Sequence, residues 1–175
     1  MLIFQELWDN HPTITDDDNP CSTNGKANFP DQCAIQMGTA LSACGVNTAQ
    51  IPGVRHCWYH QQSAGHTLAA EELANGLKRY SIAGLGRIQL VNPINFKKEL
   101  ASQKGIIFFK DYWMRTINGK KEEFRNRSGD HIDLWNGSRL TDWFSWIRIQ
   151  IGFSWERRFS NYTKSKEIWF WKVLT

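Results

Sequence analysis

The sequence predicts an α+β domain in which helices come first and an antiparallel sheet follows. Two observations carry this prediction. Apolar residues recur at helical spacings of three and four in the first half of the chain, whereas the second half holds short runs of β-branched and aromatic residues. The chain has 175 residues, which is enough to bury a core, and it shows no internal repeat or linker. We therefore expect a single domain over residues 1–175.

A helix that begins near residue 31 is the element around which we expect the others to be organised. Pro30 stands near its start, and Asp31 or Asn28 is a suitable N-cap. Gly45 supplies the C-terminal stop. Cys33 then lies in the first turn, where free backbone N–H groups and the positive end of the helix dipole favour a thiolate. The apolar face of the helix consists of Ala34, Met37, Leu41 and Cys44.

The other elements are expected in a simple order along the chain. A short amphipathic helix over residues 1–10 is followed by a polar loop that leads into the Cys33 helix. A second helix opens at residues 66–67, with Leu73 and Leu77 on its apolar stripe. Later segments are an extended piece at 88–91, a short helix at 95–103, a strand at 105–112, a loop at 118–123, and strands at 130–135 and 167–173.

Charge and hydropathy exclude several classes of function. The net charge is only +4, and Lys and Arg are spread along the chain, which disfavours a dedicated nucleic-acid-binding protein. Nowhere do 18 apolar residues follow one another, so we expect no membrane span. The first residues lack a basic region and an adequate apolar run, so we expect no secretory signal.

The cysteines do not form a disulfide framework by their spacing. They stand at positions 21, 33, 44 and 57, without a CxxC pair. If Cys33 is catalytic, at most one disulfide is possible among Cys21, Cys44 and Cys57, and the sequence leaves the pairing open.

The residue types around Cys57 suggest a zinc site, but their spacing disfavours one. His56, His60 and His66 are near it, and Cys57 with His60 has a spacing that zinc sites use. A structural zinc site needs three or four ligands with a recognisable second pair, and the sequence has no CxxC or HxxxH partner. We therefore predict no metal and no cofactor.

A second stretch supplies a base and a carboxylate. Residues 130–135 alternate as a half-buried strand, and Asn136-Gly137 is a strong signal for a two-residue hairpin turn. In that register Trp135 pairs with Ser138, and His131 pairs with Asp142. Directly opposed residues share a face with Cβ atoms about 4.5–5.5 Å apart, so Asp142 would accept a hydrogen bond from the imidazole.

Asp133 is the other carboxylate near His131. It lies two residues along the same strand and faces the same side, without being opposed to the histidine.

A cysteine at a helix start, a histidine and an orienting carboxylate are the groups needed for acyl transfer through a thioester. We therefore predict Cys33 as nucleophile, His131 as base and acid, and Asp142 as the third member.

At this point the chain resembles a known family, the type VI secretion amidase effectors, family four. The resemblance rests on DQCAIQMG at 31–38, RHCW at 55–58, GH at 65–66 with AEELA at 70–74, and GDHIDLWNG at 129–137, in this order. It implies a papain-like fold of the NlpC kind, with the Cys33 helix packed on the sheet, and the site residues Cys33, His131 and Asp142. The family often has a late cysteine pair, and this sequence has no cysteine after Cys57.

The resemblance also implies a function. It implies cleavage of the γ-D-glutamyl–meso-diaminopimelate bond in the peptide stem of bacterial peptidoglycan, which makes the stem peptide the substrate. Delivery by the type VI apparatus into the periplasm of a rival, and inhibition by a cognate immunity protein, are implied as well. Two alternatives stay open: an acyltransferase that uses the same triad, and a non-catalytic wall-binding module rich in aromatic residues.

Overall fold

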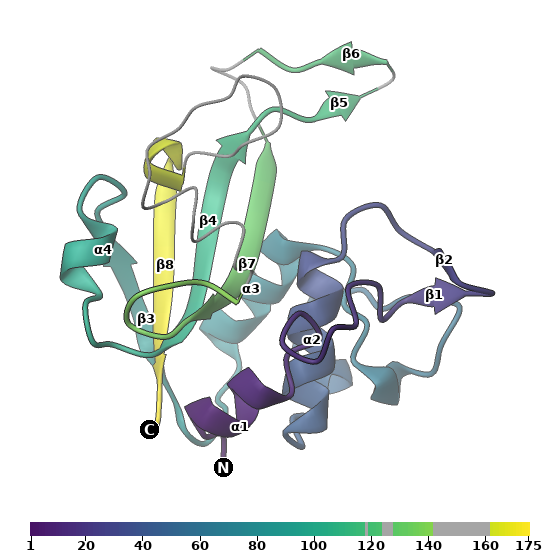
Figure 1. Cartoon of the computed structure of the whole chain (residues 1–175), viewed down its shortest axis with the longest axis horizontal. Coiled ribbons are helices and arrows are strands. Elements are labelled where there is room, and N and C mark those ends of the chain that lie inside the picture. Colours follow the sequence, from purple (N-terminus) through teal and green to yellow (C-terminus); the bar gives the residue numbers. More distant parts are fainter. Residues whose placement is uncertain (118, 124–127, 142–161) are drawn as a thin grey trace.

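A four-stranded antiparallel sheet forms the centre of the computed structural model, which describes residues 1–117, 119–123, 128–141 and 162–175 (Figure 1). The strand order is β3-β8-β4-β7. Their bounds are Leu85–Val91 for β3, Gly105–Trp113 for β4, Gly129–Trp135 for β7 and Glu167–Val173 for β8. The sheet together with the helices described below confirms the α+β prediction.

Three helices cover one face of the sheet (Figure 1). They are α1 (Phe4–Asp9), α2 (Cys33–Ala43) and α3 (Ala70–Arg79). The apolar face predicted for the Cys33 helix is confirmed, because its residues pack into the core between the helices and the sheet. Buried residues of this core include Phe4, Leu7, Ala34, Met37, Leu41, Leu73, Leu77, Ile106, Phe108, Ile132, Leu134 and Trp171.

The other face of the sheet is also covered. The helix α4 (Phe96–Glu99), the turn after β7 and the 3-10 helix η4 (Tyr162–Lys164) contribute to a second core. This core contains Val91, Phe96, Leu100, Ile107, Phe109, Trp135, Leu140, Tyr162, Ile168 and Phe170. Burial on both faces explains why β4 has the continuous apolar run 106–109 in place of an alternating pattern.

The helix α2 ends at the glycine that the sequence predicts. Gly45 has a φ of +78°, a left-handed conformation that costs glycine little. Its N–H donates to the carbonyl of Ser42 at 2.9 Å, and the N–H of Val46 donates to the carbonyl of Leu41 at 3.0 Å. These two bonds form a Schellman motif, which satisfies the last carbonyls of the helix.

Several predicted elements are shifted or shortened in the structure. The second helix begins at Ala70, because residues 66–68 make backbone hydrogen bonds with 55–57 instead. The helix expected at 95–103 is limited to α4. Part of the loop expected at 118–123 forms the strand β6 (Lys120–Lys121), which pairs with β5 (Thr116–Ile117).

The segment that precedes α2 and the segment that follows it are irregular. The first contains the short pair β1 (Ser22–Thr23) and β2 (Lys26–Ala27). The second contains the 3-10 helices η1 (Thr48–Gln50) and η2 (Gln62–Ala64). Within the part of the chain that the structure describes, no helix has the length and apolar character that crossing a membrane requires.

Candidate active site

Cys33 is the first residue of α2, and its side chain is partly exposed. The predicted N-cap was wrong, because Gln32 occupies that position and makes no side-chain capping bond. The Gln32 amide instead donates to the carbonyl of Cys21 at 3.1 Å and accepts from the N–H of Cys21 at 3.3 Å. The backbone N–H groups of the first helical turn are therefore not capped by this side chain, and they remain available beside the thiol.

His131 lies on β7, at one edge of the described sheet. Its imidazole is surrounded by aromatic rings, with ring centroids 6.4 Å from Phe109, 6.3 Å from Tyr112 and 5.7 Å from Tyr162. The Cys33 side chain is close enough to contribute to the raised pKa of this imidazole, and both residues line the same pocket. The structure thus brings together the two residues that the sequence predicts as nucleophile and base, although they are far apart in the chain.

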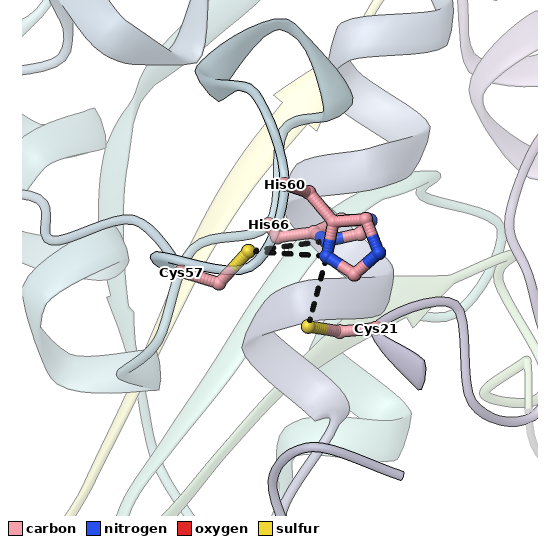
Figure 2. A group of neighbouring side chains, drawn as sticks. All are labelled: Cys21, Cys57, His60 and His66. Carbon is pink, nitrogen blue, oxygen red and sulfur yellow. Dashed lines mark hydrogen bonds between the residues drawn. The ribbon is translucent and has the colours of Figure 1, made fainter. Parts of the chain in front are cut away.

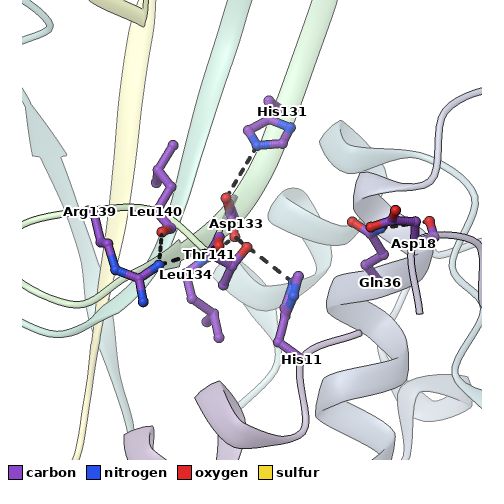
Figure 3. A network of polar contacts seen from close by, with 9 residues as sticks. All are labelled: His11, Asp18, Gln36, His131, Asp133, Leu134, Arg139, Leu140 and Thr141. Atoms are coloured by element: carbon purple, nitrogen blue, oxygen red, sulfur yellow. Dashed lines mark hydrogen bonds and ion pairs between the residues drawn. The ribbon is translucent and has the colours of Figure 1, made fainter. Parts of the chain in front are cut away.

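The carboxylate that the structure places near this imidazole belongs to Asp133 (Figure 3). Its Oδ2 lies 3.6 Å from Nε2 of His131, and its Oδ1 lies 3.9 Å from Nε2 of His11. Oδ1 also accepts hydrogen bonds from the Thr141 hydroxyl and the Leu134 N–H. Burial raises the pKa of Asp133, but the two histidines and the Thr141 hydroxyl outweigh it and lower the pKa below its ordinary value.

The charge of His131 is set by these neighbours. Burial alone lowers the pKa of the imidazole. Four neighbours raise the pKa of the imidazole: in decreasing order of effect, they are Tyr162, Tyr112, Asp133 and Cys33. Together they raise the pKa of His131 well above its usual value, so the imidazolium form persists at neutral pH. Since Nε2 faces Asp133, Nδ1 is the ring nitrogen left for the thiol.

His11 is a site residue that sequence analysis missed. It follows α1, its side chain is almost fully buried, and burial lowers its pKa. The imidazole is therefore mainly neutral at pH 7 while it lies beside Asp133. Only an isolated histidine in a polar loop marks this position in the sequence, and nothing in that pattern predicts burial.

The turn after β7 differs from the predicted two-residue hairpin. Trp135 pairs with Leu140 and not with Ser138. Residues 136–139 therefore form the turn in place of Asn136 and Gly137 alone. The predicted register was wrong by two residues.

The side chain of Asn136 explains this longer turn. Its Oδ1 accepts from the N–H groups of Ser138 and Arg139, at 3.0 and 2.9 Å, and such side-chain bonds compete with a tight hairpin. The predicted pair of Trp135 with Ser138, from which Asp142 was counted opposite His131, is therefore not formed. Asp142 itself lies outside the described residues, so its role stays a prediction.

Cys33 and His131 open onto one pocket of about 610 Å³, a volume typical of sites for small ligands. Its wall includes the aromatic residues Tyr112 and Trp113 and charges of both signs. The charged lining residues are Asp31, Arg55, Arg115 and Asp130. A pocket with paired charges beside a thiol suits a substrate that carries both carboxylate and ammonium groups.

The model of one protein family, type VI secretion system amidase effector protein 4, matches residues 29–171. The chain belongs to this family. The match covers most of the chain, including both pocket residues Cys33 and His131, and it confirms the resemblance drawn from the motifs. Members are amidase effectors of peptidoglycan that the type VI apparatus secretes into target cells. No curated protein matches the chain.

In this amidase effector, Asp130 has the most strongly altered carboxyl pKa of the pocket. Burial raises its pKa from 3.8 to about 6, although the N–H of Asp111 and the Arg115 guanidinium oppose the change. The native state therefore binds more protons than the unfolded chain between these two values. Stability is greatest below the lower pKa and falls as the pH rises through the higher one.

We expect Asp130→Asn to remove this pH dependence. The variant should be more stable than wild type by about 1–2 kcal/mol at about pH 7.5, with no difference at about pH 4. Asn retains the oxygen that accepts from the Asp111 N–H at 2.9 Å. Urea unfolding, monitored by circular dichroism, measures the free energy of unfolding at both pH values. Asp31 is an exposed carboxylate on the same pocket, so Asp31→Asn is the control. This variant should have the same stability as wild type at both pH values. Equal stability of Asp130→Asn and wild type at the higher pH would contradict the argument.

The four cysteines are all free in the structure. A separate cluster of Cys21, Cys57, His60 and His66 has the composition of a metal site, which sequence analysis did not predict. Spacing along the chain relates Cys57 only to its near neighbours. Cys21 reaches the cluster through the fold and has no sequence signal that connects it to Cys57.

Proposed function

We propose that this amidase effector is a papain-like cysteine peptidase of the NlpC kind, with one domain. The proposal rests mainly on the position of Cys33, at the start of α2, beside His131 on the sheet, where both residues line one pocket. A nucleophile on a helix that packs against an antiparallel sheet carrying the histidine is the arrangement that the papain-like order predicts. The bond we propose as its target is the γ-D-glutamyl–meso-diaminopimelate amide of peptidoglycan stems.

The first half of the reaction transfers the acyl group to the enzyme. The Cys33 thiolate attacks the amide carbonyl carbon, and the backbone N–H of Cys33 is a donor to the developing oxyanion. The C–N bond then breaks while the His131 imidazolium gives its proton to the leaving amine. The D-glutamyl group remains on sulfur as a thioester.

Water completes the reaction. The neutral imidazole of His131 takes a proton from water, whose oxygen attacks the thioester carbonyl. The C–S bond breaks and Cys33 returns to the thiolate paired with imidazolium. The γ-carboxylic acid leaves and gives the second proton of the water to solvent. The raised pKa of His131 supports this cycle, because it keeps the proton on the imidazole in the resting enzyme.

We propose Asp142 as the third member of the triad, from the family resemblance. Nε2 of His131 is buried and has no hydrogen-bond partner among the described residues, since Asp133 stays at 3.6 Å. A carboxylate from outside these residues would satisfy it. Asp133 then acts as a second negative charge that keeps the imidazole protonated.

The pocket charges support a stem-peptide substrate. Arg55 and Arg115 are cations for the carboxylates of D-glutamate and diaminopimelate, while Asp31 and Asp130 suit an ammonium group. The Nε of Arg115 is buried without a hydrogen-bond partner among the described residues, which leaves it a donor for a ligand. We further propose that a cognate immunity protein inhibits the enzyme by covering this pocket.

Product analysis tests the proposed reaction. Purified peptidoglycan with meso-diaminopimelate is digested with wild type and with Cys33→Ala, and the products are analysed by mass spectrometry. We expect a free γ-carboxyl on D-glutamate and a free amine on diaminopimelate with wild type alone. A new crosslink would indicate acyl transfer, release of whole stems would indicate a different amide bond, and unchanged products with both proteins would indicate a wall-binding module. Each of these three results contradicts the proposal.

A further inference from the structure

Four side chains from two irregular segments meet beside α2 (Figure 2). Cys21 comes from the segment before β1, whereas Cys57, His60 and His66 come from the loop between η1 and α3. One ligand atom from each lies within 4.8 Å of the other three. Both sulfurs and His66 are buried, and the group is separate from Cys33 and His131.

Ordinary hydrogen bonds do not account for this arrangement. Nδ1 of His60 lies 3.6 Å from Sγ of Cys21 and 3.5 Å from Sγ of Cys57. Nδ1 of His66 lies 3.4 Å from Sγ of Cys57. A ring nitrogen has one in-plane site, either a proton or a lone pair, so the His60 nitrogen serves only one of its two sulfur neighbours. A single cation between the four atoms would satisfy all of them.

The distances agree with tetrahedral zinc. With Zn–S bonds of about 2.3 Å and Zn–N bonds of about 2.0–2.1 Å, sulfur and nitrogen ligands are separated by about 3.5–3.6 Å. The three sulfur–nitrogen distances in the cluster are 3.4, 3.5 and 3.6 Å. Two thiolates with two imidazoles form a common structural zinc site, and soft sulfur with imidazole disfavours magnesium and calcium.

We infer that Cys21, Cys57, His60 and His66 bind one zinc ion. On binding, the two thiols lose their protons, and the two thiolates neutralise the dication, so the buried centre carries no net charge. All four positions are filled by protein, which makes this a structural site with no place for water or substrate.

The surroundings are those of a structural centre. The Asn28 side chain donates to Sγ of Cys21 at 3.7 Å, and the N–H of Cys57 donates to the carbonyl of His66 at 2.9 Å. The backbone of Cys21 is also bonded to the Gln32 side chain, directly before the nucleophile. The ion would thus fix the segment that leads into α2 against the loop between η1 and α3.

Metal analysis of the full chain tests this inference. The protein is expressed with zinc in the medium, freed of any tag, dialysed and analysed by inductively coupled plasma mass spectrometry. We expect about one zinc per chain for wild type and less than about a tenth of that for Cys57→Ser and His66→Ala. Cys44→Ser, a cysteine outside the cluster, is the matched control and should keep the full zinc content.

Wild-type protein alone gives a second measurement, because the variants at buried positions could fail to fold. After removal of zinc with a chelator, added cobalt should produce thiolate charge-transfer bands and the visible bands of a tetrahedral site. In the zinc form, iodoacetamide should modify Cys33 and Cys44 but spare Cys21 and Cys57. Wild type without zinc or cobalt bands, a disulfide between Cys21 and Cys57, or equal zinc loss in Cys44→Ser would each overturn the inference.

Discussion

Cys33→Ala should lower peptidoglycan hydrolysis by at least about 10³-fold, because it removes the thiol that lies beside His131 in the pocket. The fold should be retained, since the side chain is partly exposed at the start of α2 and alanine favours a helix. Release of diaminopimelate amines from defined stem peptides measures the rate, and circular dichroism checks the fold.

Cys44→Ala is the matched control for this experiment. Cys44 lies at the other end of the same helix, is partly buried like Cys33, and contacts the core instead of the pocket. We expect its rate to stay within about twofold of wild type. If iodoacetamide inactivated the enzyme while Cys33 remained unmodified, the assignment of the nucleophile would be wrong.

With Asp142 as the proposed third member of the triad, Asp142→Asn should cost about 10²–10⁴-fold in turnover without unfolding the protein, because the imidazole would lose its orienting carboxylate. Asp133→Asn should have a smaller effect on turnover. It should destabilise the protein by about 1–3 kcal/mol, because it removes the buried negative charge that lies beside the protonated His131. Urea unfolding and initial rates separate the two effects.

The pH profile adds a measurement that a merely structural role would not change. Asp133 is one of the groups that raise the pKa of His131. Its neutralisation therefore lowers that pKa, and the alkaline limb of the profile should move to lower pH. The reverse ranking of turnover, with both variants folded, would make Asp133 the third member in place of Asp142.

The local signals of the sequence predicted the centre of this molecule well. The spacing of Ala34, Met37 and Leu41 predicted the buried face of α2, and Gly45 predicted its end. The apolar run at 105–112 predicted β4. These signals succeed because each depends on residues within one element, where side-chain period and backbone conformation are directly coupled.

Features that depend on contacts between distant segments were not predictable in the same way. Gln32 replaced the expected cap because its amide is bonded to Cys21, eleven residues earlier. Asn136 enlarged the turn through its own side chain, and the dipeptide signal for a tight hairpin does not weigh that competition. His11 meets Asp133 only in the folded chain. Such contacts arise from tertiary packing, and the periodicity of the sequence carries no information about them.

The position of β8 in the sheet has a consequence for how the enzyme is made. Residues 167–173 are the last strand in chain order, yet they lie between β3 and β4 (Figure 1). While a ribosome is still translating the earlier segments, β3 lacks the strand with which it pairs among the described residues, and β4 lacks one of the two neighbours that the described sheet gives it. Both cores that β8 helps to fill stay open until it emerges. Pairings over such long sequence separations form slowly. The nascent effector therefore acquires its complete sheet only after residue 173 has left the ribosome.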